Sequence, residues 1–155
     1  MNLSPLPPDV RFDLLPRSDE AFDFSFGAKR CALGPYIIER WGWDAAYQQQ
    51  THRKNFNEKP FFQIIYQDHQ AGTLSVMASD DYIRFGEFYL FPAYQGKGLG
   101  TRILRHCFSL ADALGLPIRL EYLKWNPVGT LYRRNGFVVT GESEVHWFME
   151  SPFLS

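Results

Sequence analysis

Three glycines at alternate positions give this sequence a turn that could bind an anion. They lie at 96, 98 and 100, within the segment Gln95–Thr101. The preceding run Phe85–Phe91 is aromatic and has strong β propensity, and Pro92 ends it. Apolar residues then recur every three or four positions as far as Leu114, which predicts an amphipathic helix. The first N–H groups of a helix lack partners within it and lie at the positive end of its dipole, so the segment predicts a phosphate cradle.

Two common phosphate-binding patterns do not fit this segment. The dinucleotide pattern G-x-G-x-x-G fails because the third glycine comes too early. The P-loop pattern requires Ser or Thr after its lysine, whereas Gly98 follows Lys97. An ordinary glycine-rich turn between a strand and a helix stays open as the alternative.

The elements around this turn predict one α+β domain over residues 1–155, with a loose proline-rich tail at 1–8. A helix is expected from Ser18 through Cys31, interrupted at Gly34–Pro35, and then a second helical stretch. The full order is β-α-α-β-β-β-α-β-α-β-β. Strands are predicted at Val10–Leu14, Phe61–Tyr66, Ala71–Met77, from Tyr82 to the glycine turn, Ile118–Leu123, Phe137–Val139 and Val145–Met149, and further helices at Ala45–Phe56, from the glycine turn to Gly115, and from Asn126 to Arg134.

The glycine turn resembles the Q/R-x-x-G-x-G/A signature of the GNAT superfamily of acyl-CoA-dependent N-acetyltransferases. Gln95, Gly98 and Gly100 meet that signature. Gln95 stands where arginine is commoner, a replacement that the family accepts.

A second segment, Asn126–Phe137, is similar to another signature of the same family. Its Asn ends a strand, Tyr132 follows six residues later, and a Gly-Phe pair leads into the next strand. One helix and one strand separate the two segments, as in the family. Gly129 stands where the family often has alanine. The resemblance covers the chain from about Phe61 onward.

The resemblance implies a mixed, mostly antiparallel seven-stranded sheet flanked by helices. Two parallel strands would splay apart near Leu90 and Trp125 to form the acyl-CoA cleft. The loop amides would hold the pyrophosphate, and the Leu90 N–H would lie near the thioester oxygen, where a fixed donor stabilises developing negative charge. The residues implied in binding acetyl-CoA are Leu90, Gln95, Gly96, Lys97, Gly98, Gly100, Thr101 and Asn126.

Two side chains are expected to take part in catalysis. A cysteine-like thiol has a pKa of about 8.5 and tyrosine about 10, so the Tyr132 phenol could donate a hydrogen bond or a proton to the departing sulfur. Glu87 could accept the proton that an amine must lose, through a bound water. The alternatives are a packed Tyr132 with a solvated hydroxyl, and a Glu87 carboxylate that is on the surface or structural, with solvent as the base.

The acceptor is expected near Trp41, Trp43 and Asp44, with His146 as a further candidate. Aromatic rings beside acids would suit a cationic amine. The alternatives are core or lid packing for the tryptophans and a structural role for His146. The acceptor could be a small molecule, an amino acid, a peptide or a lysine side chain.

The leading hypothesis is transfer of an acetyl group from acetyl-CoA to a primary amine by direct attack in a ternary complex. A non-catalytic CoA-binding sensor and an enzyme for another acyl-CoA stay open. Charged residues make up 21% and the net charge is −1, which disfavours nucleic-acid binding. We expect a cytoplasmic protein without membrane contacts and without a metal, since its histidines lack metal-ligand spacing. A homodimer is left open, and Cys31 and Cys107 are expected to be free buried thiols.

Overall fold

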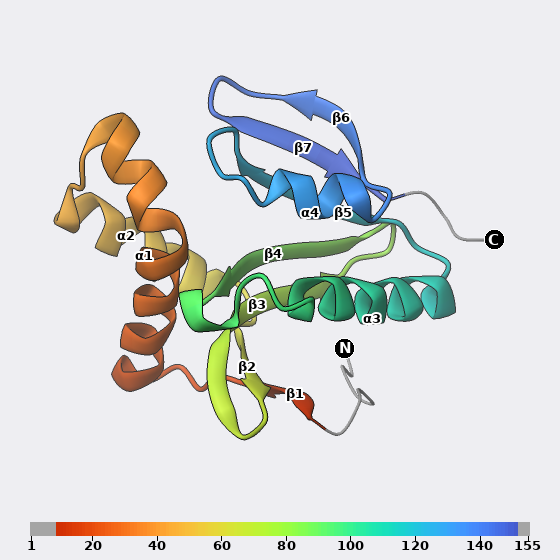
Figure 1. Ribbon diagram of the computed structural model, residues 1–155, viewed down its shortest axis with the longest axis horizontal. Coiled ribbons are helices and arrows are strands. Elements are labelled where there is room, and N and C mark those ends of the chain that lie inside the picture. The colour runs from red at the N-terminus through yellow and green to blue at the C-terminus, as the bar shows by residue number, and fades with distance from the viewer. Residues whose placement is uncertain (1–8, 152–155) are drawn as a thin grey trace. The chain divides into compact units, whose positions relative to one another are not determined.

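A computed structural model gives the fold of this chain and describes residues 9–151, so the expected tail at 1–8 lies outside the described residues. The predicted order of strands and helices is confirmed (Figure 1). In chain order the elements are β1 (Val10–Leu14), α1 (Asp19–Trp41), α2 (Ala45–Glu58), β2 (Phe62–Tyr66), β3 (His69–Ala78), β4 (Ile83–Leu90), the 3-10 turn η1 (Pro92–Tyr94), α3 (Leu99–Leu114), β5 (Ile118–Leu123), α4 (Gly129–Arg134), β6 (Val138–Glu142) and β7 (His146–Glu150).

The strands form a seven-stranded sheet in the order β1-β2-β3-β4-β5-β7-β6. β1 pairs with β2, β2 with β3, β5 with β7 and β6 with β7, all antiparallel. β4 and β5 are parallel, and their ladder joins Ile83 with Ile118 and Arg84 with Arg119. The strand after the glycine helix thus lies parallel to the strand before it, as a right-handed crossover through α3 allows. The predicted fold class, a mostly antiparallel mixed sheet with helices, is confirmed.

The described residues group into two compact units, and β3 and β4 contribute to both. The first unit contains residues 9–75 and 87–94, and the second contains residues 76–86 and 95–151. The expectation of a single domain stays a prediction. Over the described range, the helices are too short or too polar for any of them to span a lipid bilayer.

The first unit begins with a longer helix than the sequence predicted. The expected interruption at Gly34–Pro35 is wrong, because α1 runs unbroken from Asp19 to Trp41 with Pro35 inside it. Ser18 caps the start, where its hydroxyl accepts a hydrogen bond from the Ala21 N–H at 3.1 Å. Pro35 is exposed, whereas residues on the opposite face are buried on both sides of it, and this burial outweighs the lost backbone hydrogen bond. The buried neighbours are Leu33, Gly34 and Ile37.

The core of the first unit surrounds a buried histidine. The imidazole of His52 has no solvent exposure and lies 5.2 Å from the ring centroid of Phe22 and 5.5 Å from that of Phe61. Its Nε2 is 2.7 Å from the Ser25 hydroxyl, which in turn donates to the Phe22 carbonyl oxygen. Ser25 therefore accepts from an Nε2–H, and Nδ1 is left without a partner among the described residues. Burial lowers the pKa of His52 from 6.5 to about 4, so the ring is neutral at neutral pH.

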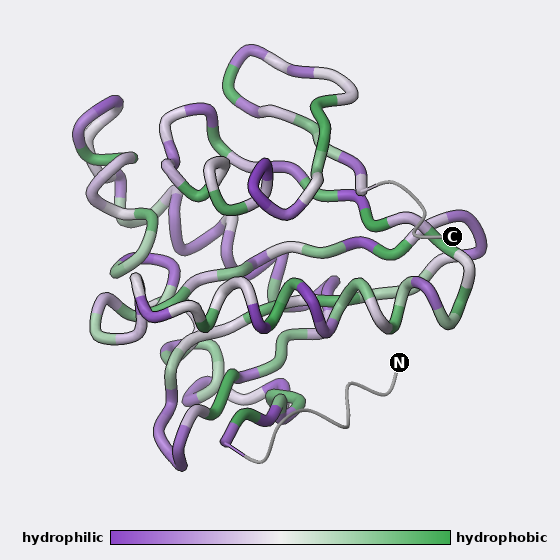
Figure 2. Tube along the Cα trace, turned by 45° about the vertical axis from the view of Figure 1, so that its right-hand side comes forward, coloured by the Kyte–Doolittle hydropathy of each residue, from purple (hydrophilic) through white to green (hydrophobic). Residues whose placement is uncertain are grey.

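The second unit is built on α3, whose apolar face was predicted from its spacing. Hydrophilic and hydrophobic residues alternate along α3 in Figure 2. Gly115 ends the helix in a left-handed conformation, as predicted. Cys107 is buried on the apolar face, which raises the pKa of its thiol to about 12. Cys31 is exposed, so its expected burial is wrong; it lies on the outer face of α1. The buried residues of α3 are Leu99, Ile103, Leu104, Cys107 and Ala111.

The buried histidine makes the stability of the fold depend on pH. Between pH about 6.5 and about 4 the unfolded chain binds a proton at His52 that the folded chain does not. The unfolding free energy should therefore fall as the pH is lowered, by up to about 3 kcal/mol from this residue. In His52→Leu this part of the pH dependence should disappear. Urea unfolding at pH 7 and pH 4.5, followed by tryptophan fluorescence, measures the unfolding free energy of wild type and of His52→Leu. The variant His69→Gln, which changes an exposed histidine, is the control. An unchanged pH slope in His52→Leu would contradict the expectation.

Candidate active site

The predicted anion cradle lies at the start of α3. Gly96 and Gly98 have φ angles of +71° and +78°, a left-handed conformation that glycine adopts without strain. Gly98 is the N-cap of α3, and no side chain caps the helix there. The residues from Gln95 to Gly98 are exposed, and Gly100 and Thr101 are half-buried. The left-handed turns thus present the start of α3 to solvent with no capping side chain over its N–H groups.

The first backbone N–H groups of α3 have no acceptor within the described residues. Arg102 N–H donates to the Gly98 carbonyl oxygen at 3.2 Å, and this bond begins the helix. Within residues 9–151, no N–H from Gly98 to Thr101 donates to a protein carbonyl or side chain. A row of free N–H groups at a helix start can bind a phosphate. The alternative of an ordinary glycine-rich turn between a strand and a helix stays open.

Tyr132 lies on α4 in an aromatic environment. Its side chain is buried, with ring centroids 5.6 Å from Tyr122 and 5.7 Å from Phe137. Burial raises the pKa of the Tyr132 phenol far above its usual value, and the neighbouring Tyr122 raises it further. The phenol therefore keeps its proton across the physiological pH range. The expected alternative, a packed ring with a solvated hydroxyl, stays open.

Tyr122 is a neighbour of Tyr132 that the sequence analysis did not single out. Its hydroxyl accepts a hydrogen bond from Arg133 Nη2 at 3.0 Å. An added Cβ at Gly129 would lie 2.7 Å from Tyr122 Cζ and would clash with its hydroxyl. The glycine that departs from the family pattern thus makes room for this tyrosine. The alternation of β5, in which Ile118, Leu120 and Tyr122 point inward, was the signal that could have identified Tyr122.

Asn126 begins the turn into α4. Its Oδ1 accepts a hydrogen bond from the Val128 N–H at 3.0 Å, and its own N–H donates to the Leu123 carbonyl oxygen at 2.9 Å. The side chain therefore orders the local backbone at the start of the turn. The expected contact of Asn126 with acetyl-CoA stays a prediction.

Glu87 lies within β4 with an unusual backbone. Its φ is +47°, a strained conformation for a residue with a side chain, and Thr73 Oγ1 donates to its carbonyl oxygen at 2.9 Å. The side chain is only 7% exposed. Lys59 Nζ lies 3.1 Å from Oε1, and the Tyr89 hydroxyl donates to Oε2 at 3.1 Å. A surface carboxylate is therefore wrong, and the structural hydrogen bonds that were the other alternative are present.

Two further basic side chains lie near Glu87 and were missed from the sequence. Lys29 is 6% exposed, on the buried face of α1, and His52 is the neutral core histidine. Burial is the main cause that lowers the pKa of Lys29; the Glu87 charge opposes this shift and the Lys59 charge adds to it. A lysine in register with Ser25 and Leu33 on an otherwise apolar helix face was the available signal.

Two of the residues expected at the acceptor site, Trp43 and Asp44, make structural contacts in the first unit. The Arg30 guanidinium lies 5.5 Å from the centroid of the Trp43 ring, and Phe26 packs at 6.2 Å from it. Asp44 is the N-cap of α2 and accepts from the Tyr47 N–H at 3.0 Å. Trp41 is 52% exposed. Acceptor binding by these residues stays a prediction, and a cation already faces Trp43.

The expected site residues divide between the two units. Glu87, Leu90 and the tryptophans belong to the first unit, in which Leu90 is the last residue of β4. The glycine turn, Asn126, Tyr132 and His146 belong to the second unit; His146 is half-buried on β7 and pairs with Leu123 of β5. Each half of the predicted site is thus assembled within its own unit. The approach of Glu87 to Tyr132 stays a prediction.

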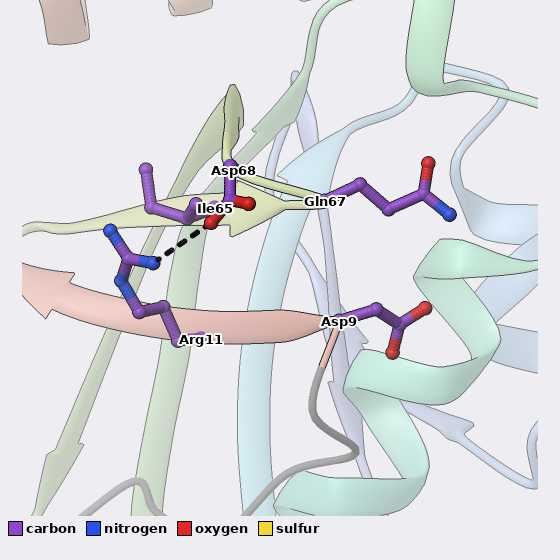
Figure 3. A pocket seen from close by; sticks show the side chains of 5 residues that line it. All are labelled: Asp9, Arg11, Ile65, Gln67 and Asp68. Atoms are coloured by element: carbon purple, nitrogen blue, oxygen red, sulfur yellow. Dashed lines mark ion pairs between the residues drawn. The ribbon is translucent and has the colours of Figure 1, made fainter.

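A hollow on β1 and β2 contains none of the expected site residues (Figure 3). Arg11 Nη1 lies 3.6 Å from Asp68 Oδ1 across it, and the Asp68 side chain is 95% exposed. Solvent screens such a pair, so the hollow has no desolvated group for chemistry. Across the described part of the chain, no group of three or more His, Cys, Asp and Glu side chains is placed to hold a metal ion.

Comparison with known proteins places these features in one family. A sequence model described as the acetyltransferase (GNAT) domain matches residues 57–139. A search of curated proteins found no match.

Three solved structures illustrate the fold likeness. The PaiA N-acetyltransferase of Thermoplasma acidophilum, in complex with coenzyme A, has a TM-score of 0.69 and 17% identity over 92% of this chain and 99% of that chain. The ribosomal-protein-S18-alanine N-acetyltransferase of Escherichia coli has a TM-score of 0.65 and 18% identity, over 94% of this chain and 96% of that chain. An acetyltransferase of the GNAT family from Streptococcus pneumoniae has a TM-score of 0.59 and 17% identity, over 94% of this chain and 99% of that chain.

The contact between Gly129 and Tyr122 leads to a stability prediction. Gly129→Ala should lower the unfolding free energy by about 1–3 kcal/mol, because the new Cβ meets a buried ring that cannot move freely. Adding Tyr122→Leu should recover part of that loss, so the two changes should be non-additive. Gly27→Ala is the matched control, since nothing lies within 4 Å of its added Cβ in α1. Chemical denaturation of the four variants tests this; additive losses at 129 and 122 would contradict it.

Proposed function

The chain belongs to the GNAT acetyltransferase family, and from this membership we propose that it transfers the acetyl group of acetyl-CoA directly to a primary amine in a ternary complex. Family membership supports acyl-CoA-dependent acyl transfer as the general activity. The acetyl group, the amine and the direct attack are the finer proposal. The observation that carries it is the row of N–H groups from Gly98 to Thr101 that have no acceptor in the described part of the chain, at the position of the family's cofactor signature.

The cradle would hold acetyl-CoA by its pyrophosphate. The free N–H groups at the start of α3 supply donors, and the helix dipole favours the negative charge. Gly96 and Gly98 keep Cβ atoms away from these donors, and Lys97 is exposed beside them. The bound thioester would supply the acetyl group. Leu90, at the end of β4, is the proposed donor to the thioester oxygen.

Tyr132 is proposed to stabilise the departing sulfur by a hydrogen bond. As the new C–N bond forms, the C–S bond breaks and the sulfur takes the electron pair. Because burial raises the phenol pKa far above that of a thiol, full transfer of the Tyr132 proton is unfavourable. A shared hydrogen bond lowers the energy of the developing thiolate without that transfer. The burial of Tyr132 supports this hydrogen-bonding role over the role of proton donor.

Glu87 is proposed to receive the proton of the acceptor ammonium, directly or through a water. Its carboxylate is held between Lys59 and Tyr89, and these two contacts fix its position. The low exposure of the side chain strengthens its interaction with a nearby ammonium. Solvent as the base stays the alternative.

Glycine substitutions at the two ends of α3 test whether acetyl-CoA binds at the start of this helix. Gly98→Ala should weaken acetyl-CoA binding about tenfold or more, because its φ of +78° strains alanine and a Cβ enters the anion site. Gly115→Ala, where φ is +68°, imposes similar strain at the far end of the helix and should leave affinity unchanged. Isothermal titration of acetyl-CoA into the three proteins measures this. Equal affinity in wild type and Gly98→Ala would argue against binding at this turn.

Loss of the Tyr132 hydroxyl should affect turnover more than binding. With acetyl-CoA and a panel of amines, followed by thiol release, Tyr132→Phe should lower kcat about 100-fold while acetyl-CoA affinity stays within about twofold. Tyr66→Phe, in the first unit and outside the expected site, is the matched control. Equal kcat in wild type and Tyr132→Phe would remove the residue from its role. Tight binding with no amine consumed would favour a CoA sensor, and faster reaction with a longer acyl-CoA would favour another acyl donor.

A further inference from the structure

The first unit contains a buried group of polar side chains that we call the lysine–glutamate cluster: Lys29, Lys59, Glu87 and Tyr89. Glu87 uses both carboxylate oxygens, one with Lys59 Nζ at 3.1 Å and one with the Tyr89 hydroxyl at 3.1 Å. Lys59 ends α2 and keeps 21% of its side chain exposed, so the cluster has a side that solvent reaches. The Glu87 side chain is 7% exposed.

Lys29 is the member of the cluster that lacks a partner. It is 6% exposed on the inner face of α1, and within the described range no hydrogen bond or ion pair reaches its ammonium group. Glu87 attracts it electrostatically and Lys59 repels it, while burial disfavours its charge. Most buried lysines have a partner, because an unpaired buried charge loses its hydration without compensation.

The cluster contains two lysines and one glutamate, so its charges do not cancel when both lysines are protonated. Among the described residues, Glu87 is the acidic group that acts on Lys29 and His52, and His52 is neutral. Lys29 is therefore a buried donor without a carboxylate of its own, and a carboxylate from a ligand could pair with it.

We propose that Lys29 binds a carboxylate of the acceptor, so that the acceptor is an amino acid or another small amine that carries a carboxylate. This proposal rests on the proposed function and names the substrate class of the same site. Lys29 would hold the carboxylate, while the amine of the same molecule would lie towards Glu87. The acceptor would thus be oriented at two points by side chains of opposite charge.

The charge balance favours this class over the other amines. An amino carboxylate would place its negative charge beside Lys29 and its ammonium beside Glu87, so that each end meets a side chain of opposite charge. A simple alkylamine leaves the excess positive charge uncompensated, and a polyamine adds to it. A phosphate dianion would overcompensate it. The Arg30 guanidinium over Trp43 likewise leaves less room for a purely cationic acceptor in this unit.

Matched pairs of amines test the proposal. Each amino acid is compared with its own amide: glycine with glycinamide, L-leucine with L-leucinamide, L-phenylalanine with its amide, and β-alanine with β-alaninamide. In wild type the carboxylate member of at least one pair should have a kcat/KM about tenfold or more above that of its amide. Lys29→Met should remove that preference by lowering kcat/KM for the acid and leaving the amide within about twofold.

Two controls separate this role from a structural one. Lys54→Met, on the exposed face of α2, should behave as wild type. Lys29→Met should not lower the unfolding midpoint, because it removes an uncompensated buried charge, and Lys29→Gln provides a second neutral variant. An equal loss for acids and amides in both variants would mark Lys29 as a structural residue or a base and would overturn the proposal.

Binding measurements separate failure of this proposal from failure of the proposed function. The same pairs are titrated calorimetrically into the protein saturated with CoA. Acetyl transfer without preference for the carboxylate member would overturn the Lys29 proposal and leave the transferase function standing. Lys29-dependent binding of the acids without transfer would support the carboxylate site and contradict the transferase function. Absence of both binding and turnover for every acid would overturn the Lys29 proposal.

Discussion

The constraint on which the first unit depends is the burial of the Glu87 carboxylate within β4. A carboxylate at this depth needs partners, and Lys59 and Tyr89 supply them, while Thr73 donates to the backbone carbonyl oxygen of the same residue. These contacts also hold the strained φ of +47° at Glu87, which β4 alone would not favour. Lys59, which supplies the charged partner, is the C-cap residue of α2.

The two units differ in the groups that they offer to a charged ligand. The second unit offers unpaired backbone N–H groups at the start of α3, whose partial charges need no side chain and no pKa shift. The first unit uses full charges on buried side chains, where burial decides which of them stay ionised. Tyr132 differs from both, because burial and the neighbouring Tyr122 raise the pKa of its phenol and keep it neutral. Proton transfer and hydrogen bonding can thus be assigned to different residues.

Several sequence-based expectations failed where tertiary contacts outweighed local preference. Pro35 lies inside α1 because the inner face of the helix is buried on both sides of it. Cys31 is exposed because it lies on the outer face of the same helix. Acceptor binding by Trp43 and Asp44 stays a prediction, and in this structure the Arg30 guanidinium packs over the tryptophan and the aspartate caps α2. In each case the residue type was informative, but the helix face on which it lies decided its role.

The sequence by itself determined the order of elements, the glycine turn and the segment that contains Tyr132. These depend on local spacing, on glycine's conformational freedom and on apolar periodicity, all of which can be read along the chain. Only the tertiary structure brought Lys29 and Lys59 to Glu87, and Tyr122 to Gly129. Those neighbours lie far apart in the sequence. Their charges interact strongly and their side chains contact one another only when folding buries them together and removes the water between them.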